Sequence, residues 1–126
     1  MKLIVRDVKE LQSSEYQACY GLNLRDKGLM RDRLVECRHT RQGYVVMLFE
    51  NDVLLSWALV WAYDLAKDQW GAYFYTRESQ RRKGYGSKVA GTVKENWTNI
   101  TSWPSDDIGY KFFDRHKFKQ NYRWYR

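Results

Sequence analysis

Proline and cysteine are scarce in this chain, which has one proline and two cysteines among 126 residues. Two thiols, Cys19 and Cys37, are too few for a disulfide framework, so a reduced, cytoplasmic setting is expected. The two histidines add too few ligands for a structural zinc site, and no metal is expected. The start of the chain, MKLIVRDV, is apolar over only three residues between charges, which indicates neither a signal peptide nor a membrane span.

Apolar residues and positive charge are abundant by contrast. Hydrophobic residues make up 44% of the sequence, which excludes a disordered chain, and the length suits one folded domain over residues 1–126. The formal net charge is +7. A surface this basic attracts polyanions, so the sequence predicts either a phosphate-rich small ligand or nucleic acid as a partner.

The spacing of apolar and turn residues predicts ten elements in the order β-α-α-β-β-β-α-β-α-β. Strands are expected over residues 2–8, 43–50, 53–63, 70–76 and 99–103, with a tight hairpin turn at Asn51-Asp52. Residues 118–126 are expected to form a terminal strand or a very short hairpin. Helices are expected over 15–24, with Ser13 and Ser14 as N-caps, over 29–37, from 87 to about 97, and after Ser105. This order predicts an α/β (α+β) fold with a mixed, mainly antiparallel central sheet and helices on both faces.

The segment WGAYFYTRESQRRKGYGSKVAGTVKENW, residues 70–97, joins an aromatic strand to a helix through a basic loop that ends in Gly84-Tyr85-Gly86. The first N–H groups of a helix have no partner inside the helix, and the helix dipole adds positive potential there. Glycine allows the backbone to adopt a positive φ or to approach a phosphate closely. Basic residues surround these amides, namely Arg81, Arg82, Lys83 and Lys88. The loop therefore predicts a pyrophosphate site.

Two common phosphate motifs match this loop poorly. The P-loop pattern G-x-x-x-x-G-K-[ST] is absent, because no glycine lies five residues before Gly86. The dinucleotide pattern G-x-G-x-x-G matches at Gly84 and Gly86 but has Val89 at its third position. Asp106 lies near the distance expected of a ribose-binding acid, yet the chain is too short for a doubly wound domain.

A third pattern, (Arg/Gln)-x-x-Gly-x-(Gly/Ala) after a strand, matches at every fixed position of Arg81-Arg82-Lys83-Gly84-Tyr85-Gly86. This pattern is the acetyl-CoA signature of the GNAT superfamily of N-acetyltransferases, which the chain resembles. A second family pattern, N-x-x-A-x-x-F-Y-x-K-x-G-F, is matched in part by residues 106–118. Its small, aromatic, basic and closing aromatic positions fall on Gly109, Phe112, Arg115 and Phe118. The resemblance covers residues 43–126 and implies a GNAT-like fold.

The resemblance implies an N-acetyltransferase that transfers an acetyl group from acetyl-CoA to a primary amine by direct attack in a ternary complex. It implies that acetyl-CoA, the co-substrate, lies where the strands 70–76 and 99–103 diverge. The cofactor-binding residues that it implies are Tyr75, Thr76, Arg81, Arg82, Lys83, Gly84, Tyr85, Gly86, Ser87, Asp106 and Phe113. The second partner is then an amine acceptor, either a small molecule or a protein amine.

The groups that such a reaction needs are incomplete in this sequence. Phe113 stands where the family usually has a tyrosine that protonates the departing thiolate, so Tyr110, one helical turn earlier, is the candidate general acid. The strand 70–76 contains no acid to act as general base, and Glu50, Asp64 and Asp68 are each expected to be hairpin-turn residues. A chain of water molecules is then the expected route for the proton of the amine.

Aromatic residues are plentiful on the strands that flank the expected cleft, namely Trp57, Trp61, Tyr63, Tyr73 and Trp103. Most of them are expected in the core, but aromatics among basic residues also suit stacking on a base or an aromatic amine. Two alternatives to the enzyme stay open. One is a catalytically weak acyl-CoA-binding module, and the other is a basic protein that binds RNA or acetylates aminoacyl-tRNA. A homodimer through an exposed sheet edge is a further expectation.

Overall fold

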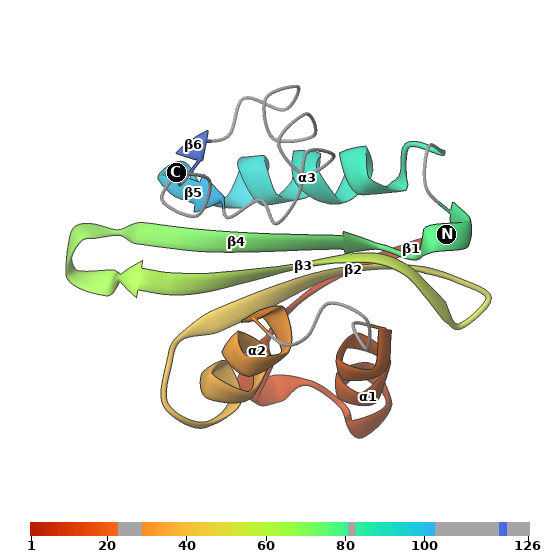
Figure 1. Cartoon of the computed structure of the whole chain (residues 1–126), viewed down its shortest axis with the longest axis horizontal. Helices are drawn as coiled ribbons and strands as arrows, with labels where there is room; N and C mark the ends of the chain where they lie inside the picture. The colour runs from red at the N-terminus through yellow and green to blue at the C-terminus, as the bar shows by residue number, and fades with distance from the viewer. Residues whose placement is uncertain (23–28, 81–82, 103–118, 121–126) are drawn as a thin grey trace.

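A six-stranded sheet forms the centre of the computed structural model, which describes residues 1–22, 29–80, 83–102 and 119–120 (Figure 1). Its strands lie side by side in sequence order: β1 (Lys2–Asp7), β2 (Gly43–Glu50), β3 (Val53–Asp64), β4 (Gln69–Thr76), β5 (Ile100–Ser102) and β6 (Lys119–Gln120). The first four form an antiparallel meander, whereas β5 is parallel to β4 and β6 is parallel to β5. The predicted mixed, mainly antiparallel sheet is confirmed.

The hairpin between β2 and β3 sets the register of the sheet. Asn51 and Asp52 form its turn with φ of 50° and 64°. Two consecutive residues with positive φ are what a type I′ turn requires, and this turn matches the right-handed twist of the strands that it joins. The tight turn predicted from the Asn-Asp pair is confirmed.

The residues of β3 alternate between two hydrophobic clusters, one on each face of the sheet. The large side chains of Trp57, Leu59 and Trp61 pack under α1 and α2. The smaller side chains of Ala58, Val60 and Ala62 pack under α3 on the other face. Successive side chains of a strand point to opposite faces, so this one strand supplies both layers of the core.

In the described part of the chain, three helices cover the two faces of the sheet. α1 (Ser13–Leu22) and α2 (Leu29–His39) lie on one face, and α3 (Tyr85–Asn96) lies on the other (Figure 1). Short 3-10 helices in the described connections are η1 (Val8–Glu10), η2 (Leu65–Lys67) and η3 (Glu78–Gln80). Helices on both faces, as predicted, are confirmed. None of the described helices combines the length and the apolar composition that a membrane crossing needs.

Several predicted element ends differ from the structure by one or two residues; α2 ends at His39 rather than at residue 37, and α3 begins at Tyr85 rather than at residue 87. At two other ends a carboxylate caps a helix. β1 ends at Asp7 rather than at residue 8, because the Asp7 side chain accepts from the Lys9 N–H at 2.9 Å and so caps η1. The N-cap of α1 is Gln12 rather than one of the two serines, since the Gln12 carbonyl accepts from the Tyr16 N–H at 3.0 Å. Glu15 accepts from the Gln12 N–H at 3.0 Å, which is one half of a capping box.

The C-terminal part of the chain is described only in its strands. β5 and β6 fall within the predicted strands 99–103 and 118–126. The helix predicted after Ser105 lies outside the described residues, and so do Asp106, Tyr110 and Phe113.

Candidate functional site

Gly84 joins the loop after β4 to α3 in a conformation that other residues rarely adopt. It is the N-cap of α3 with φ 81° and ψ 5°. A Cβ placed there would meet no atom within 4 Å, so the glycine is needed for its backbone conformation and not for lack of space. Of the two reasons that the sequence offers for glycine here, close approach to a phosphate or a positive φ, the structure shows the positive φ at Gly84. Gly86 lies in the first turn of α3.

The N-terminus of α3 presents backbone N–H groups without a capping side chain. The N-cap residue makes no side-chain hydrogen bond, because it is a glycine. The first backbone hydrogen bond of the helix runs from the Lys88 N–H to the Gly84 carbonyl at 3.1 Å. The amides of Tyr85 and Gly86 precede that bond, and the positive end of the helix dipole lies at the same place. Such an end suits an anion.

Two lysines add charge to this helix end. Lys83 is exposed, and its amine donates to Gln80 Oε1 at 3.1 Å. Lys88 is also exposed, one turn into α3. Arg81 and Arg82, which are predicted to take part in the same site, lie outside the described residues. The described part of the loop therefore combines helix amides, a left-handed glycine and two exposed cations.

β4 extends four residues beyond the last one that it pairs with β5. The parallel register runs from Trp70 opposite Ile100 to Ala72 opposite Ser102, whereas β4 ends at Thr76. The extra residues lead toward the loop that ends at Gly84, so the far end of β4 and the start of α3 lie at the same end of the sheet (Figure 1).

The backbone of β4 faces its two neighbours alternately. The Trp70 N–H donates to the Asn99 carbonyl, on the β5 side, at 3.0 Å. The Tyr75 carbonyl accepts from Ser56 Oγ of β3 at 3.2 Å. Because the direction alternates along a strand, the backbone groups of Thr76 lie on the β5 side. Tyr75 and Thr76 are both among the predicted cofactor-binding residues. The backbone of Thr76 is thus on the β5 side, where the strands diverge, and that of Tyr75 is on the β3 side.

A charged cluster on the α1/α2 face adjoins β4, and the sequence interpretation did not identify it. Arg33 Nη1 donates to Glu36 Oε2 at 2.9 Å, and Arg41 Nε donates to Glu36 Oε1. Arg41 Nη1 also donates to the Ala62 carbonyl at 2.7 Å. The two guanidinium carbons lie 4.4 and 5.3 Å from the centre of the Trp61 ring. The three-residue spacing of Arg33 and Glu36 on a helix was the available sequence signal.

The pKa values in this cluster follow from its hydrogen bonds and its burial. The hydrogen bond from Arg41 holds the pKa of Glu36 below its usual range, with a further contribution from Arg33. Burial raises the pKa of Tyr73, although Arg33 donates to its hydroxyl and opposes the rise. Tyr73 follows Ala72, the last β4 residue paired with β5, and stacks on Trp61 at 6.2 Å. Tyr73 is therefore a neutral phenol near neutral pH.

The carboxylates considered as general bases have structural roles in turns. Asp64 accepts from the Lys67 N–H at 3.3 Å and caps η2. Asp68 accepts from Trp70 Nε1 at 2.8 Å and has a positive φ of 51°. Glu50 is exposed beside the β2–β3 turn. These observations confirm the predicted turn roles. Within the described part of the chain, no group of three potential metal ligands comes together.

The aromatic residues of the strands divide between core and surface. Trp57 and Trp61 are buried, at 0% and 2% exposure, and Tyr73 packs partly buried against them. Tyr63 is 55% exposed and contacts Trp61 edge-on at 5.8 Å. Trp103 lies outside the described residues. The expectation that most of these rings belong to the core is therefore confirmed for the two described tryptophans.

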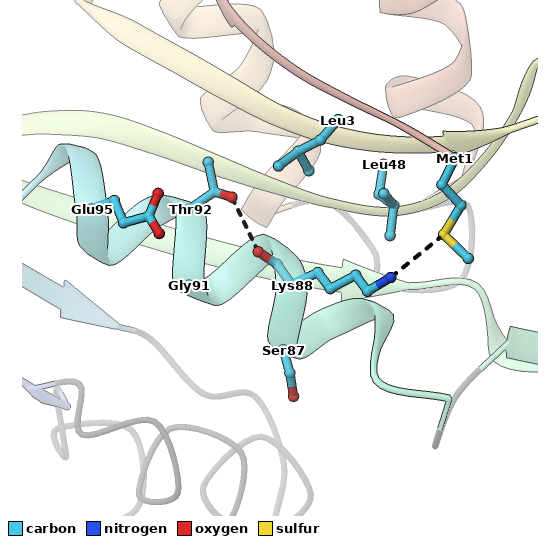
Figure 2. Close-up of a pocket in the computed structure, with 8 residues that line it drawn as sticks. All are labelled: Met1, Leu3, Leu48, Ser87, Lys88, Gly91, Thr92 and Glu95. Atoms are coloured by element: carbon cyan, nitrogen blue, oxygen red, sulfur yellow. Dashed lines mark hydrogen bonds between the residues drawn. The ribbon is translucent and has the colours of Figure 1, made fainter.

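A pocket of about 400 Å³ lies along the flank of α3 that faces β1 and β2. Figure 2 shows apolar side chains on its sheet side and polar side chains on its helix side; the lining residues are Met1, Leu3, Leu48, Ser87, Lys88, Gly91, Thr92 and Glu95. Lys88 Nζ contacts Met1 Sδ at 4.0 Å there. Two residues from the first turns of α3, Ser87 and Lys88, thus line this pocket, on the flank away from β5.

Comparisons with known proteins identify the fold. No family model and no curated protein sequence matches the chain, but solved structures do. AAC(6′)-Iy in complex with the bisubstrate analog CoA-S-monomethyl-acetylneamine superposes with a TM-score of 0.65 at 12% identity, over 94% of this chain and 92% of that one. Ribosomal-protein-alanine N-acetyltransferase from Brucella melitensis superposes with a TM-score of 0.62 at 9% identity, over 91% and 90%.

A third solved structure carries the family name itself. It is a Bacteroides thetaiotaomicron protein assigned to the GNAT family of acetyltransferases, with a TM-score of 0.59 at 15% identity, over 92% of this chain and 70% of that one. This chain therefore has the fold of the GNAT N-acetyltransferases. At such low identities the likeness establishes the fold, and the resemblance inferred from residues 81–86 is confirmed at that level.

Proposed function

We propose that this protein is an N-acetyltransferase that uses acetyl-CoA and acetylates a primary amine by direct attack in a ternary complex. The observation that carries the proposal is Gly84, which begins α3 in a left-handed conformation directly after the extended end of β4. On a GNAT fold, this arrangement leaves the uncapped helix amides and the exposed Lys83 at one anion site.

The described residues suit the pyrophosphate of CoA. The N-terminus of α3 lacks a capping side chain, so a ligand phosphate can accept from the amides of Tyr85 and Gly86. Lys83 adds a positive charge at the rim. The backbone on the β5 side of β4, at Thr76, would line the arm of the cofactor. The proposal assigns Arg81 and Arg82 to the same pyrophosphate.

The reaction needs few groups from the protein. When bound, acetyl-CoA supplies an acetyl group activated as a thioester. The neutral amine attacks the carbonyl carbon, the carbon–sulfur bond breaks, and the sulfur departs as a thiolate. A backbone N–H of β4 holds the carbonyl oxygen as its charge grows. The proton lost by the amine passes to water, and Tyr110 is the proposed donor to the thiolate, because Phe113 has no hydroxyl.

The first test is calorimetric titration with acetyl-CoA of the wild type and of the variant Gly84→Asp. Aspartate tolerates positive φ better than most residues, and its carboxylate would itself accept from the helix amides. We expect binding to weaken about 10- to 100-fold, because a hydrogen bond to a charged group contributes ~1.5–3 kcal/mol.

Gly91→Asp is the matched control for this titration. Gly91 is an exposed glycine of the same helix, and a Cβ there would meet no atom within 4 Å. The control adds the same charge about two turns from the helix start, where the dipole effect has decayed, so its affinity should stay near that of the wild type. A folded wild type that does not bind acetyl-CoA, or equal losses in the two variants, would contradict the proposed site.

The second test measures turnover. Release of free CoA from acetyl-CoA should accelerate in the presence of a suitable primary amine, and the acetyl group should be recovered on that amine by mass spectrometry. Tight binding with no acetyl transfer to any amine of a broad panel would instead favour the catalytically weak acyl-CoA-binding module. The absence of a hydroxyl at Phe113 is the sequence feature that favours this second candidate.

A further inference from the structure

Two arginines of α2 lie over two tyrosines of α1 on the face of the sheet opposite α3. The guanidinium carbon of Arg31 is 3.9 Å from the centre of the Tyr20 ring, and that of Arg38 is 4.3 Å from the centre of the Tyr16 ring. The two tyrosine rings stack on each other, 6.0 Å apart with 16° between their planes. We call these four residues the arginine–tyrosine ladder.

The ladder follows from the spacing of the residues on two antiparallel helices. Tyr16 and Tyr20 are four positions apart on α1, and Arg31 and Arg38 are seven positions apart on α2. Both spacings place side chains on one face of a helix. The later arginine lies over the earlier tyrosine, as two helices that run in opposite directions require. The arrangement therefore holds both guanidinium groups in fixed positions at the seam of α1 and α2.

The ladder arginines have no carboxylate partner among the residues that the structure describes. The two neighbouring arginines, Arg33 and Arg41, share the carboxylate of Glu36, whereas neither Arg31 nor Arg38 forms an ion pair in that part of the chain. Arg31 Nε is buried and makes no hydrogen bond there. Arg33 and Arg41 thus share one carboxylate, whereas the guanidinium groups of Arg31 and Arg38 pack on tyrosine rings and have no acidic partner among the described residues.

Arginine on an aromatic ring is a particular kind of anion site. The ring orients one face of the planar guanidinium, and the N–H groups along its edge can donate to phosphate oxygens in pairs. The outer face of the plane can stack on a nucleobase, as arginine does in single-stranded RNA complexes. A carboxylate peptide or a lipid headgroup would use the charge but not the stacking face.

We propose that the arginine–tyrosine ladder of α1 and α2 binds a single RNA strand, with Arg31 and Arg38 holding phosphates and stacking on bases. The site is separate from the anion site at Gly84, which belongs to the opposite face of the sheet (Figure 1). The inference does not depend on the proposed acetyltransferase activity, and either can fail alone.

The test is fluorescence anisotropy of labelled oligouridylate with the full chain, over a series of KCl concentrations. Each phosphate contact to a single strand contributes ~0.7 to the slope of log K against log salt. Removing both contacts in Arg31→Gln/Arg38→Gln should therefore lower the slope by ~1.4 and weaken binding about 25-fold near 0.1 M salt. The control Lys67→Gln/Lys94→Gln removes the same charge from η2 and α3, and it should leave most of the affinity intact.

Two further measurements separate the ladder from charge and from folding. Arg31→Lys/Arg38→Lys keeps the charge but loses the planar group, so its affinity should fall between those of the wild type and the glutamine variant. Crosslinking of the wild type to RNA that contains 4-thiouridine should map to residues 13–22 and 29–39. This mapping needs no variant and holds even if the glutamine variant misfolds.

Several results would overturn the proposal. One is that the folded wild type does not bind RNA. Another is that Arg31→Gln/Arg38→Gln and the control Lys67→Gln/Lys94→Gln lose the same amount of RNA affinity. A third is that the wild type binds polyglutamate or anionic vesicles as tightly as RNA. Displacement of the RNA by CoA with crosslinks confined to residues 83–96 would also overturn it, because the anion would then occupy the α3 site.

Discussion

Gly84 and Gly91 lie on the same helix, yet replacing each with alanine should have opposite effects on stability. Gly84 has φ 81° at the N-cap of α3, and Gly91 lies within the helix. At both positions a Cβ would meet no atom within 4 Å. The added methyl group therefore changes only the conformational preference of the backbone, and packing contributes little to the comparison.

The magnitudes follow from that difference. Alanine at position 84 must adopt a left-handed conformation, at a cost of about 1–2 kcal/mol. Alanine at position 91 should stabilise the helix by about 0.5–1 kcal/mol, because glycine loses more backbone entropy in a helix interior. For a chain of 126 residues, a change of 1 kcal/mol shifts Tm by roughly 4 °C. The two variants should thus differ in Tm by about 6–12 °C.

Urea unfolding followed by circular dichroism, together with calorimetric Tm values, measures both changes. Gly84→Asn is the informative third variant, because asparagine tolerates the left-handed region. It should recover most of the stability lost in Gly84→Ala. The side-chain oxygen of this asparagine would accept from the backbone N–H groups of the first turn. Acetyl-CoA binding by Gly84→Asn should therefore be weaker than that of the wild type. Stability and ligand binding are thereby separated at one position.

The reasoning fails if Gly84→Ala is as stable as the wild type, or if Gly91→Ala destabilises as much as Gly84→Ala. The first result would mean that the backbone at Gly84 relaxes to a negative φ, and the second that a methyl group at position 91 is not accommodated as the structure indicates. In the first case the phosphate site would have a different geometry from the one described here.

Three further predictions concern α2 and the core beneath it. Gly43→Ala should destabilise the fold, because its Cβ would lie 2.5 Å from Cys37 Sγ and 2.9 Å from Cys37 Cβ. Adding Cys37→Ala removes the sulfur but keeps the Cβ, so it should restore the stability only in part. No recovery in the double variant would locate the clash elsewhere. Burial raises the pKa of Cys37 from 9.0 to about 11. The folded state therefore favours the neutral thiol, so the free energy of unfolding of the wild type should fall relative to that of Cys37→Ala as the pH rises from 9 to about 11. A constant difference between the two across that range, in urea titrations, would contradict the assignment. Leu34→Ala should lower the free energy of unfolding by about 2–5 kcal/mol, because Leu34 is 0% exposed. Val35→Ala, at the exposed neighbouring position, should change it by less than about 0.5 kcal/mol. Similar losses in the two variants would show that α2 is rotated on the sheet.

Local patterns in the sequence were sufficient for much of the fold. The Asn51-Asp52 turn was predicted and confirmed, because it depends on residues a few positions apart. The need for glycine at position 84 was predicted for the same reason. The N-cap of α1 was predicted wrongly, since a serine and a nearby glutamate offer competing caps for one helix end.

In the described part of the chain, the sequence by itself thus determined the order of the elements, the hairpin turn and the need for glycine at the start of α3, because turn chemistry and side-chain periodicity act over a single element or its ends. Only the tertiary structure decided which charges meet. The stacking of Arg31 and Arg38 on the tyrosines of α1, and of Arg33 and Arg41 on Trp61 of β3, joins side chains from separate elements. Such contacts depend on how the helices pack on the sheet, and no local spacing specifies that packing.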